Sequence, residues 1–127
     1  MRVVAFLLSL NRICFGLAYL VRPGRAAQGW IGRTARDPAA QVFVRGHGAR
    51  DIALGAGALT TLARGGEQAA RPWLAAQGVA DLTDVAGTIA AGGRLPRSGR
   101  RFALLMAGAS TLAGTVSAVG LGRGHSP

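Results

Sequence analysis

Residues 72–91 read PWLAAQGVADLTDVAGTIAA, a run of 20 residues in which Asp81 and Asp84 are the only charged side chains. About 20 predominantly apolar residues are what a helix needs to cross the hydrocarbon core of a bilayer. A carboxylate at that depth is costly unless a partner, a proton or water compensates it. The stretch therefore predicts a membrane helix whose carboxylates find partners inside the protein. Arg12 and Arg50 occupy similar depths in two other apolar segments.

Three further apolar segments surround this one in the chain. The fourth segment carries no charge over 20 residues, which is about 30 Å at the rise of an α-helix. The second is the least regular, because its uncharged part is too short to span and it has to include Arg50 and Asp51. We predict an all-α fold, a four-helix transmembrane bundle forming one membrane domain over residues 1–127. Its spans are residues 3–21, 42–63, 72–91 and 102–121, and its Arg-rich loops are 22–41 and 92–101.

The first apolar segment also has features of a signal peptide. Arg2 resembles the basic start of such a peptide, and Ala26 and Ala27 resemble a cleavage site. A signal peptide needs an unbroken apolar run, however, and Asn11 and Arg12 interrupt this one. We therefore expect the mature chain to keep the segment.

The arginines are unevenly divided between the two sides that four spans would create. Basic residues accumulate in cytoplasmic loops, so nine arginines against four predict a multi-pass protein with both Arg-rich loops in the cytoplasm and both termini outside. Basic residues near a membrane surface also attract anionic lipids, by about 1 kcal/mol each. The nine are Arg22, Arg25, Arg33, Arg36, Arg45, Arg94, Arg97, Arg100 and Arg101, and the four are Arg2, Arg64, Arg71 and Arg123.

A net charge of +10 is also typical of proteins that bind nucleic acid. The basic clusters here contain few aromatic residues, and a soluble domain of this length could not bury residues 102–121 on every side. We therefore exclude nucleic acid as a partner. Arginine without lysine, together with abundant Ala and Gly, is typical of a GC-rich bacterial genome and favours a bacterial inner membrane.

Motifs for catalysis or cofactor binding are not visible in the sequence. Cys14 is the single cysteine, which rules out an intrachain disulfide and a cysteine-based metal site. His47 and His125 are far apart, and neither a phosphate-binding loop nor a Ser-His-Asp arrangement is present. We expect no catalytic residue, no metal and no cofactor.

Polar residues inside the predicted spans follow helical spacing. Gln77, Asp81, Asp84 and Thr88 are separated by four, three and four residues, which places them in one stripe of a helix. The first span has a similar stripe, formed by Ser9, Arg12, Gly16 and Tyr19. The second has His47, Asp51, Leu54 and Ala58, with Arg50 beside them. Turning every stripe inward predicts a polar network of Arg12, Arg50, Asp51, Asp81, Asp84, His47 and Gln77.

This network would contain two arginines and three aspartates, so one carboxyl group is in excess. Two carboxylates one turn apart disfavour double ionisation, so Asp81 or Asp84 is protonated unless an arginine lies between them. Two interpretations follow, and they are compatible. The network either fixes the register of the helices or forms a cavity that handles protons or binds a ligand.

Small residues at four-residue spacing, Ala49, Ala53 and Gly57, predict close helix packing within the chain or between copies. Trp30 and Trp73 are expected to be interfacial anchors.

Pro72 fits the first turn of a helix. The loop around Trp30, with Arg25, Arg33 and Arg36, is either a short amphipathic helix on the membrane surface or an ordinary connection.

The run Gly48-Ala49-Arg50-Asp51-Ile52-Ala53-Leu54-Gly55 resembles the small bacterial membrane proteins grouped as domain-of-unknown-function family 4267. Arg12, Gly16 and Pro23 before it and the two aspartates of 72–91 after it extend the resemblance over residues 6–121. The overall plan is similar to the broader class of four-span proteins related to DoxX. The resemblance implies four membrane helices and no established activity, and Arg50 and Asp51 match the family's motif.

Three functions are compatible with these features. The first is a structural or accessory component of a membrane complex, with a larger membrane protein or further copies of the chain as partner. The second is a proton-coupled, transporter-like or small-molecule-binding membrane protein. The third is a membrane enzyme that acts on a lipid-soluble substrate with an aspartate as acid or base, and we expect a non-enzymatic role ahead of it.

Overall fold

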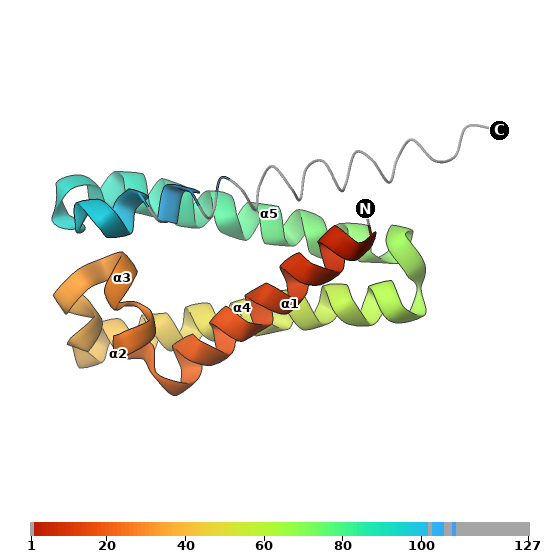
Figure 1. The fold of residues 1–127 in the computed structure, drawn as a ribbon, viewed down its shortest axis with the longest axis horizontal. Helices are drawn as coiled ribbons and strands as arrows, with labels where there is room; N and C mark the ends of the chain where they lie inside the picture. Colours follow the sequence, from red (N-terminus) through yellow and green to blue (C-terminus); the bar gives the residue numbers. More distant parts are fainter. Residues whose placement is uncertain (1, 102, 106–107, 109–127) are drawn as a thin grey trace.

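The computed structural model describes residues 2–101, 103–105 and 108, and every element in this part of the chain is helical. Three long helices form the body, and short helical segments fold over one end of it (Figure 1). The elements are α1 (Arg2–Val21), α2 (Pro23–Ala26), α3 (Gln28–Ile31), η1 (Gly32–Arg36), α4 (Pro38–Arg64), α5 (Gly66–Ala91) and η2 (Gly92–Arg94). The predicted all-α class is confirmed for the described residues.

The first helix, α1, covers the predicted span 3–21 almost residue for residue. It ends before Pro23, whose ring disfavours helical geometry at Arg22, and Arg22 has an extended φ of −136°. In the described part of the chain, α1 is the one helix whose length and apolar composition suit a membrane crossing. Core helices of soluble proteins and signal sequences can share these two properties, so this supports membrane association only weakly.

The second long helix, α4, has a well-defined start. The Oδ1 atom of Asp37 accepts a hydrogen bond of 2.8 Å from the backbone N–H of Ala39, and Pro38 occupies the first helical position. Both features are typical of helix N-termini. The helix ends at Arg64 with Gly65 as its C-cap, and Gly66 follows with a positive φ of 76°. With 27 residues, α4 extends beyond the predicted span 42–63 on both sides.

The third long helix, α5, begins at Gly66, ahead of the predicted start at residue 72. Pro72 therefore lies inside the helix and not in its first turn. Glu67 in the first turn interacts favourably with the helix dipole, and alanine has the highest helix propensity of the residues that follow. A proline removes one backbone N–H donor, and these contributions offset that loss.

Glycines bring α1 and α4 into direct contact. A Cβ atom at Gly16 would lie 2.6 Å from the carbonyl oxygen of Gly48, and one at Gly55 would lie 2.7 Å from that of Ser9. The predicted stripe of Ala49, Ala53 and Gly57 does not make this contact. Ala49 and Ala53 are exposed, because the helix turns the neighbouring glycines toward α1.

Gly57, the last member of that predicted stripe, packs against another helix. A Cβ atom at Gly57 would lie 2.4 Å from the ring of Trp73. Trp73 is 37% exposed, so part of its ring covers α4 and the rest remains accessible.

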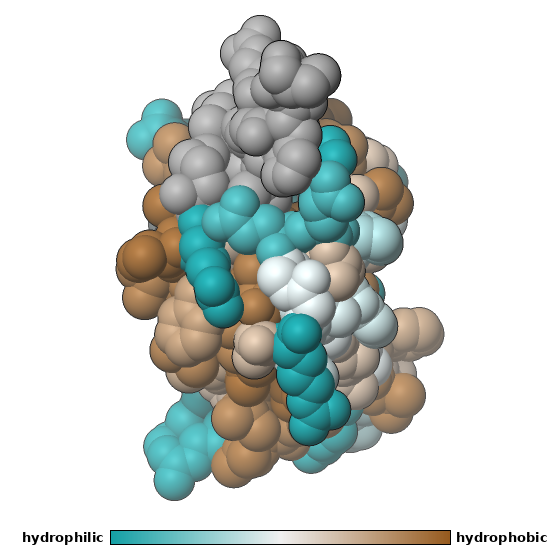
Figure 2. All heavy atoms as spheres, turned by 90° about the vertical axis from the view of Figure 1, so that its right-hand side faces the viewer, coloured by the Kyte–Doolittle hydropathy of each residue, from teal (hydrophilic) through white to brown (hydrophobic). Residues whose placement is uncertain are grey.

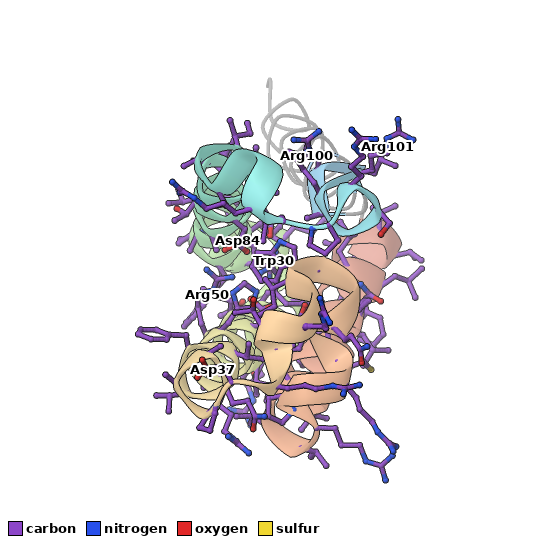
Figure 3. All side chains as sticks on the ribbon, turned by 90° about the vertical axis from the view of Figure 1, so that its left-hand side faces the viewer. Trp30, Asp37, Arg50, Asp84, Arg100 and Arg101 are labelled. Carbon is purple, nitrogen blue, oxygen red and sulfur yellow. The ribbon has the colours of Figure 1, made fainter. Side chains whose placement is uncertain are left out.

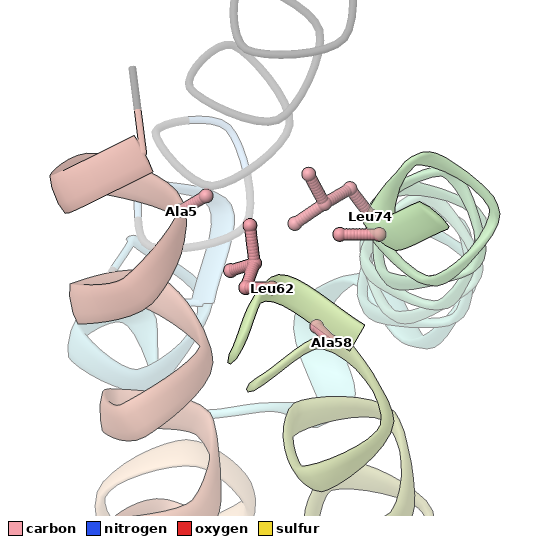
Figure 4. Close-up of a cluster of buried hydrophobic side chains, with 5 residues drawn as sticks. Ala5, Ala58, Leu62 and Leu74 are labelled. Carbon is pink, nitrogen blue, oxygen red and sulfur yellow. The ribbon is translucent and has the colours of Figure 1, made fainter. Parts of the chain in front are cut away.

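Two apolar clusters lie toward opposite ends of the bundle. The first joins α1, α4 and α5 near the turn between α4 and α5, and its members are Ala5, Ala58, Leu62, Ala70 and Leu74 (Figure 4). The second lies under the short segments and contains Ala27, Ala35 and Val44, with Tyr19 and Ile31 packed against it. Figure 2 views the end where α4 turns into α5, and hydrophilic side chains gather there between hydrophobic surfaces.

The connection 22–41 is neither a single amphipathic helix nor an irregular loop. Its three short segments fold back onto the bundle, because Ala27 and Ala35 are buried against Val44. Trp30 points inward, and its indole N–H donates a hydrogen bond of 3.2 Å to the hydroxyl oxygen of Thr88. Trp30 therefore packs against α5, and its expected role as a membrane-interface anchor stays a prediction.

The two Arg-rich loops meet at this same end of the molecule. A Cβ atom at Gly99 would lie 2.3 Å from the carbonyl oxygen of Trp30, and one at Gly32 would lie 2.7 Å from the ring of Pro96. Residues 97–101 and 103–105 are helical. The predicted fourth span, 102–121, otherwise lies outside the described residues and stays a prediction.

Candidate functional site

Arg12 of α1 connects all three long helices. Its Nη1 atom lies 2.8 Å from Oδ1 of Asp51 on α4, and its Nη2 atom forms an ion pair with Oδ1 of Asp81 on α5. The three side chains are each about one-tenth exposed. Arg12 is long enough to reach between two helices, and its planar guanidinium group presents separate donors to the two carboxylates.

Arg50 of α4 makes the second set of ion pairs. Its Nη2 and Nη1 atoms lie 2.8 Å and 3.1 Å from the two carboxylate oxygens of Asp84, a bidentate pairing that favours one fixed geometry. The Nη2 atom also lies 3.3 Å from Oδ1 of Asp51. Asp51 is therefore shared by both arginines, and the two sets of ion pairs form one network.

His47 lies one helical turn before Asp51, at the side of the network nearest the short segments. Its Nε2 atom is 3.6 Å from one oxygen of Asp51 and 3.6 Å from one oxygen of Asp84. These distances exceed those of ordinary hydrogen bonds, so they become ion pairs only when the imidazole carries a proton. The ring also contacts the rings of Tyr19 and Trp30, each with a centroid separation of 5.4 Å.

Trp30 covers this side of the network. Figure 3 looks along the bundle from the end that carries α2 and α3, with Trp30 lying between the helices beside Arg50 and Asp84. Its hydrogen bond to Thr88 fixes the indole ring in that place. Arg100 and Arg101 lie on the outside of the same view.

Gln77 extends the polar contacts toward the opposite end. Its side-chain amide nitrogen donates hydrogen bonds of 3.3 Å to the hydroxyl oxygen of Ser9 and 3.1 Å to the backbone oxygen of Leu54. Ser9 is fully buried and Gln77 is 7% exposed. Like Arg12, Gln77 joins α1, α4 and α5, but with uncharged groups that lie next to the first apolar cluster.

The structure thus brings all the residues predicted for the network into one region. The two arginines and three aspartates leave one formal negative charge in excess when His47 is neutral. Within the described residues, no group of three or more His, Cys, Asp or Glu side chains is arranged to hold a metal ion. The arginines instead occupy the carboxylates, so the arrangement supports ion pairing and proton binding.

Helical spacing revealed the inward stripes but did not reveal Trp30 as part of the site. The packing of a connection over the end of a bundle leaves no periodic signal in the sequence. The one hint was that Ala26, Ala27 and Ile31 surround Trp30 with apolar side chains.

Comparisons with known proteins give a family but no activity. No curated protein and no solved structure gives a significant match to the chain. A family model described as "Domain of unknown function (DUF4267)" matches residues 9–121. That range contains every residue of the network and most of the chain. The resemblance seen around Arg50 and Asp51 is confirmed, and the chain belongs to the DUF4267 family.

Proposed function

We propose that this chain is a small multi-pass membrane protein of four spanning helices, serving as a structural or accessory component of a membrane complex. Its ion-pair network would hold the helices in register at the middle of the bilayer. The observation that carries the proposal is the position of the network along the helices. Asp51 is the midpoint of α4, Arg12 is next to the midpoint of α1, and Asp81 is within one turn of the midpoint of α5.

The outer surface supports a membrane environment. Large apolar side chains remain exposed on each long helix, although a soluble protein of this size exposes few contiguous apolar patches. Examples with more than half of their surface accessible are Val3, Leu7, Val42, Phe43, Val79, Leu82 and Ile89. The charged groups near the middles of these helices, by contrast, are turned inward toward one another, as expected where lipid surrounds the bundle.

The mutual pairing of the charges supports a structural role. Arg12 and Arg50 each contact two aspartates, and Asp51 is shared between them. A network of this kind disfavours any rotation of a helix that would leave a charge unpaired at membrane depth. It therefore suits a protein whose role is to present a fixed shape to a partner.

Cysteine accessibility tests the topology. Thr34, Gln68 and Ser98 are exposed and lie in the first Arg-rich loop, the start of α5 and the second Arg-rich loop. Each would be replaced by cysteine in a Cys14→Ser background and treated with a membrane-impermeant maleimide. We expect Q68C to react in intact cells, and T34C and S98C only after permeabilisation. Equal labelling of all three in intact cells contradicts the spanning arrangement.

Purification in a mild detergent tests the accessory role. We expect the tagged chain to retain a larger membrane protein in fixed stoichiometry after solubilisation from its native membrane. The matched control is the Asp81→Asn variant, which weakens the network and is expected to lose the partner. A wild-type chain that purifies alone, without a partner or further copies, contradicts the accessory role.

A proton-linked small-molecule binder is the second candidate, favoured by the position of His47 between Asp51 and Asp84. One proton on this imidazole would balance the negative charge in excess and create two ion pairs. It would replace the hydrogen bond that the neutral ring accepts from Nη2 of Arg50, which lies 3.2 Å from Nε2. Infrared titration of the reconstituted protein tests this, with Asp81→Asn, Asp84→Asn and His47→Gln as assignment variants. Uptake of one proton near neutral pH that disappears in H47Q supports this role. Carboxylates and imidazole that keep one state across that range support the structural role.

A further inference from the structure

A pocket lies outside the ion-pair network, at the end of the bundle where the Arg-rich loops meet. Its volume is about 600 Å³, and its walls come from Arg22, which follows α1 directly, and from the short segments α2, α3 and η1. The lining residues are Arg22, Gly24, Arg25, Gln28 and Arg36. Pockets that hold small ligands or headgroups commonly have volumes of about 300 to 1,000 Å³.

The charge of this pocket is entirely positive. Three of its lining residues are arginines, and none is acidic. In the part of the chain that the structure describes, no carboxylate forms an ion pair with Arg22, Arg25 or Arg36. The nearest acid in sequence, Asp37, uses its Oδ1 atom to cap α4 through the N–H of Ala39. The three guanidinium groups are therefore available to an external anion.

The backbone that carries these arginines is held in place by buried contacts. Pro23, Ala27 and Ala35 are buried, and the two alanines pack against Val44 of α4. A Cβ atom at Gly24 would lie 3.2 Å from the carbonyl oxygen of Ala35, so α2 and η1 approach closely there. The close contact between α2 and η1 places Arg25 of α2 and Arg36 of η1 in the lining of the same pocket.

The pocket also lies directly beyond the end of the apolar surface of α1. Val21, the last residue of α1, is 72% exposed, and Arg22 follows it directly. If α1 spans the bilayer, Arg22 marks the boundary between acyl chains and headgroups. Guanidinium groups bind phosphate oxygens in a bidentate manner, and a basic pocket at this depth is suited to a phospholipid headgroup.

We propose that Arg22, Arg25 and Arg36 form a binding site for a phosphate group, and that its source is the headgroup of an anionic phospholipid. The lipid source rests on the proposed membrane topology, whereas the phosphate chemistry of the pocket does not. Gln28 would donate a hydrogen bond to the glycerol part of the headgroup, and the acyl chains would run along the exposed apolar face of α1.

Native mass spectrometry of the delipidated, full-length protein in detergent tests the site. Phosphatidylglycerol and phosphatidylcholine would be titrated separately into wild type, into R25Q/R36Q and into R33Q. Arg33 is the matched control, because it belongs to the same η1 segment and is exposed but does not line the pocket. Melting curves would verify that the variants remain folded.

We expect wild type to prefer phosphatidylglycerol, and R25Q/R36Q to weaken its binding by about tenfold or more. The R33Q variant should change it by less than about twofold. Equal losses in R33Q and R25Q/R36Q would overturn the proposal, because general surface charge would then account for the binding. No preference for phosphatidylglycerol over phosphatidylcholine in wild type would overturn it as well.

A competition experiment distinguishes a lipid phosphate from a free phosphate ion as the ligand. Inorganic phosphate would be added as a competitor at concentrations equal to the lipid. If it displaces the lipid and its binding depends on Arg25 and Arg36, the pocket is a phosphate site for a soluble anion and the lipid source is wrong. If the proposed four-span topology is wrong, the cysteine-labelling experiment will show it, and the phosphate competition experiment can still be interpreted. If the proposed phosphate site is wrong, the cysteine-labelling pattern will be unchanged.

Discussion

Gly16 and Gly48 face each other across α1 and α4 so closely that a Cβ atom on either would lie 2.6 Å from the carbonyl oxygen of the other. The two helices are antiparallel, and Gly55 meets the backbone of Ser9 two turns away. Between these contacts Arg12 lies opposite Asp51. The approach of the backbones therefore sets the register in which the ion pairs form.

Replacing Gly48 by alanine should weaken the contact between α1 and α4. The added methyl group meets backbone atoms, which cannot move aside as a flexible side chain can, and we expect a loss of about 1 to 3 kcal/mol in the free energy of unfolding. Thermal and denaturant unfolding in detergent would measure it. Gly46→Ala is the control, because nothing lies within 4 Å of that position. Alanine there should be neutral or stabilise by up to about 1 kcal/mol.

Asp81→Ala should leave Arg12 with Asp51 as its remaining partner in the network. Breaking a buried ion pair by removing one partner leaves an uncompensated charge, so we expect destabilisation of about 1 to 4 kcal/mol. Combining it with Arg12→Leu should recover part of that loss, since neither charge then remains unpaired. Thr83→Ala, at an exposed position of the same helix, is the control. Additive effects of D81A and R12L would contradict direct pairing.

Trp30→Phe should release the short segments from α5. The phenyl ring keeps much of the packing but cannot donate to Thr88, so we expect a loss of about 1 kcal/mol. Thr88→Val should cause a similar loss, and the double variant should lose little more than either alone. Unfolding curves of the three variants give the coupling energy. A coupling of zero would show that the hydrogen bond contributes nothing to stability.

Leu62→Ala should be among the most damaging changes in the apolar cluster near the turn between α4 and α5. Leu62 is 2% exposed and packs with Ala5 and Leu74, so its truncation leaves a cavity that costs about 2 to 5 kcal/mol. Leu82 on α5 is 56% exposed, and Leu82→Ala is the matched control. We expect it to change stability in detergent by less than about 0.5 kcal/mol. Similar losses for both leucines would contradict the assignment of the cluster as a core.

Helical spacing was sufficient to predict which side chains face inward. The four-three-four spacing of Gln77, Asp81, Asp84 and Thr88 corresponds to one face of α5, and all four make polar contacts with other helices. Spacing could not assign partners, because it fixes rotation within a helix but not between helices. That Arg12 pairs with both Asp51 and Asp81 became visible only in three dimensions.

Other features could not be predicted, because one sequence pattern is compatible with several three-dimensional arrangements. Ala49 and Gly48 are both small residues, and the burial of neighbouring side chains decides which of them faces α1. Proline favours the first turn of a helix, which predicts a helix start at Pro72, whereas the alanines and Glu67 before it extend α5 back to Gly66. The inward position of Trp30 depends on the fold of the connection 22–41, whose spacing of apolar and basic residues does not distinguish a helix on the membrane surface from segments packed onto the bundle.

The long sequence separation within the network has a consequence for how the protein is made. Arg12 finds its partners 39 and 69 residues later in the chain. In the proposed membrane arrangement, α1 leaves the ribosome with an arginine at its centre, at a cost of about 2.5 to 3.5 kcal/mol for insertion alone. Stable insertion of the first helix is then completed only after Asp51 and Asp81 have been synthesised. A nascent chain truncated before residue 81 should accordingly leave α1 easy to extract from the membrane, which couples quality control of the first helix to translation of the third.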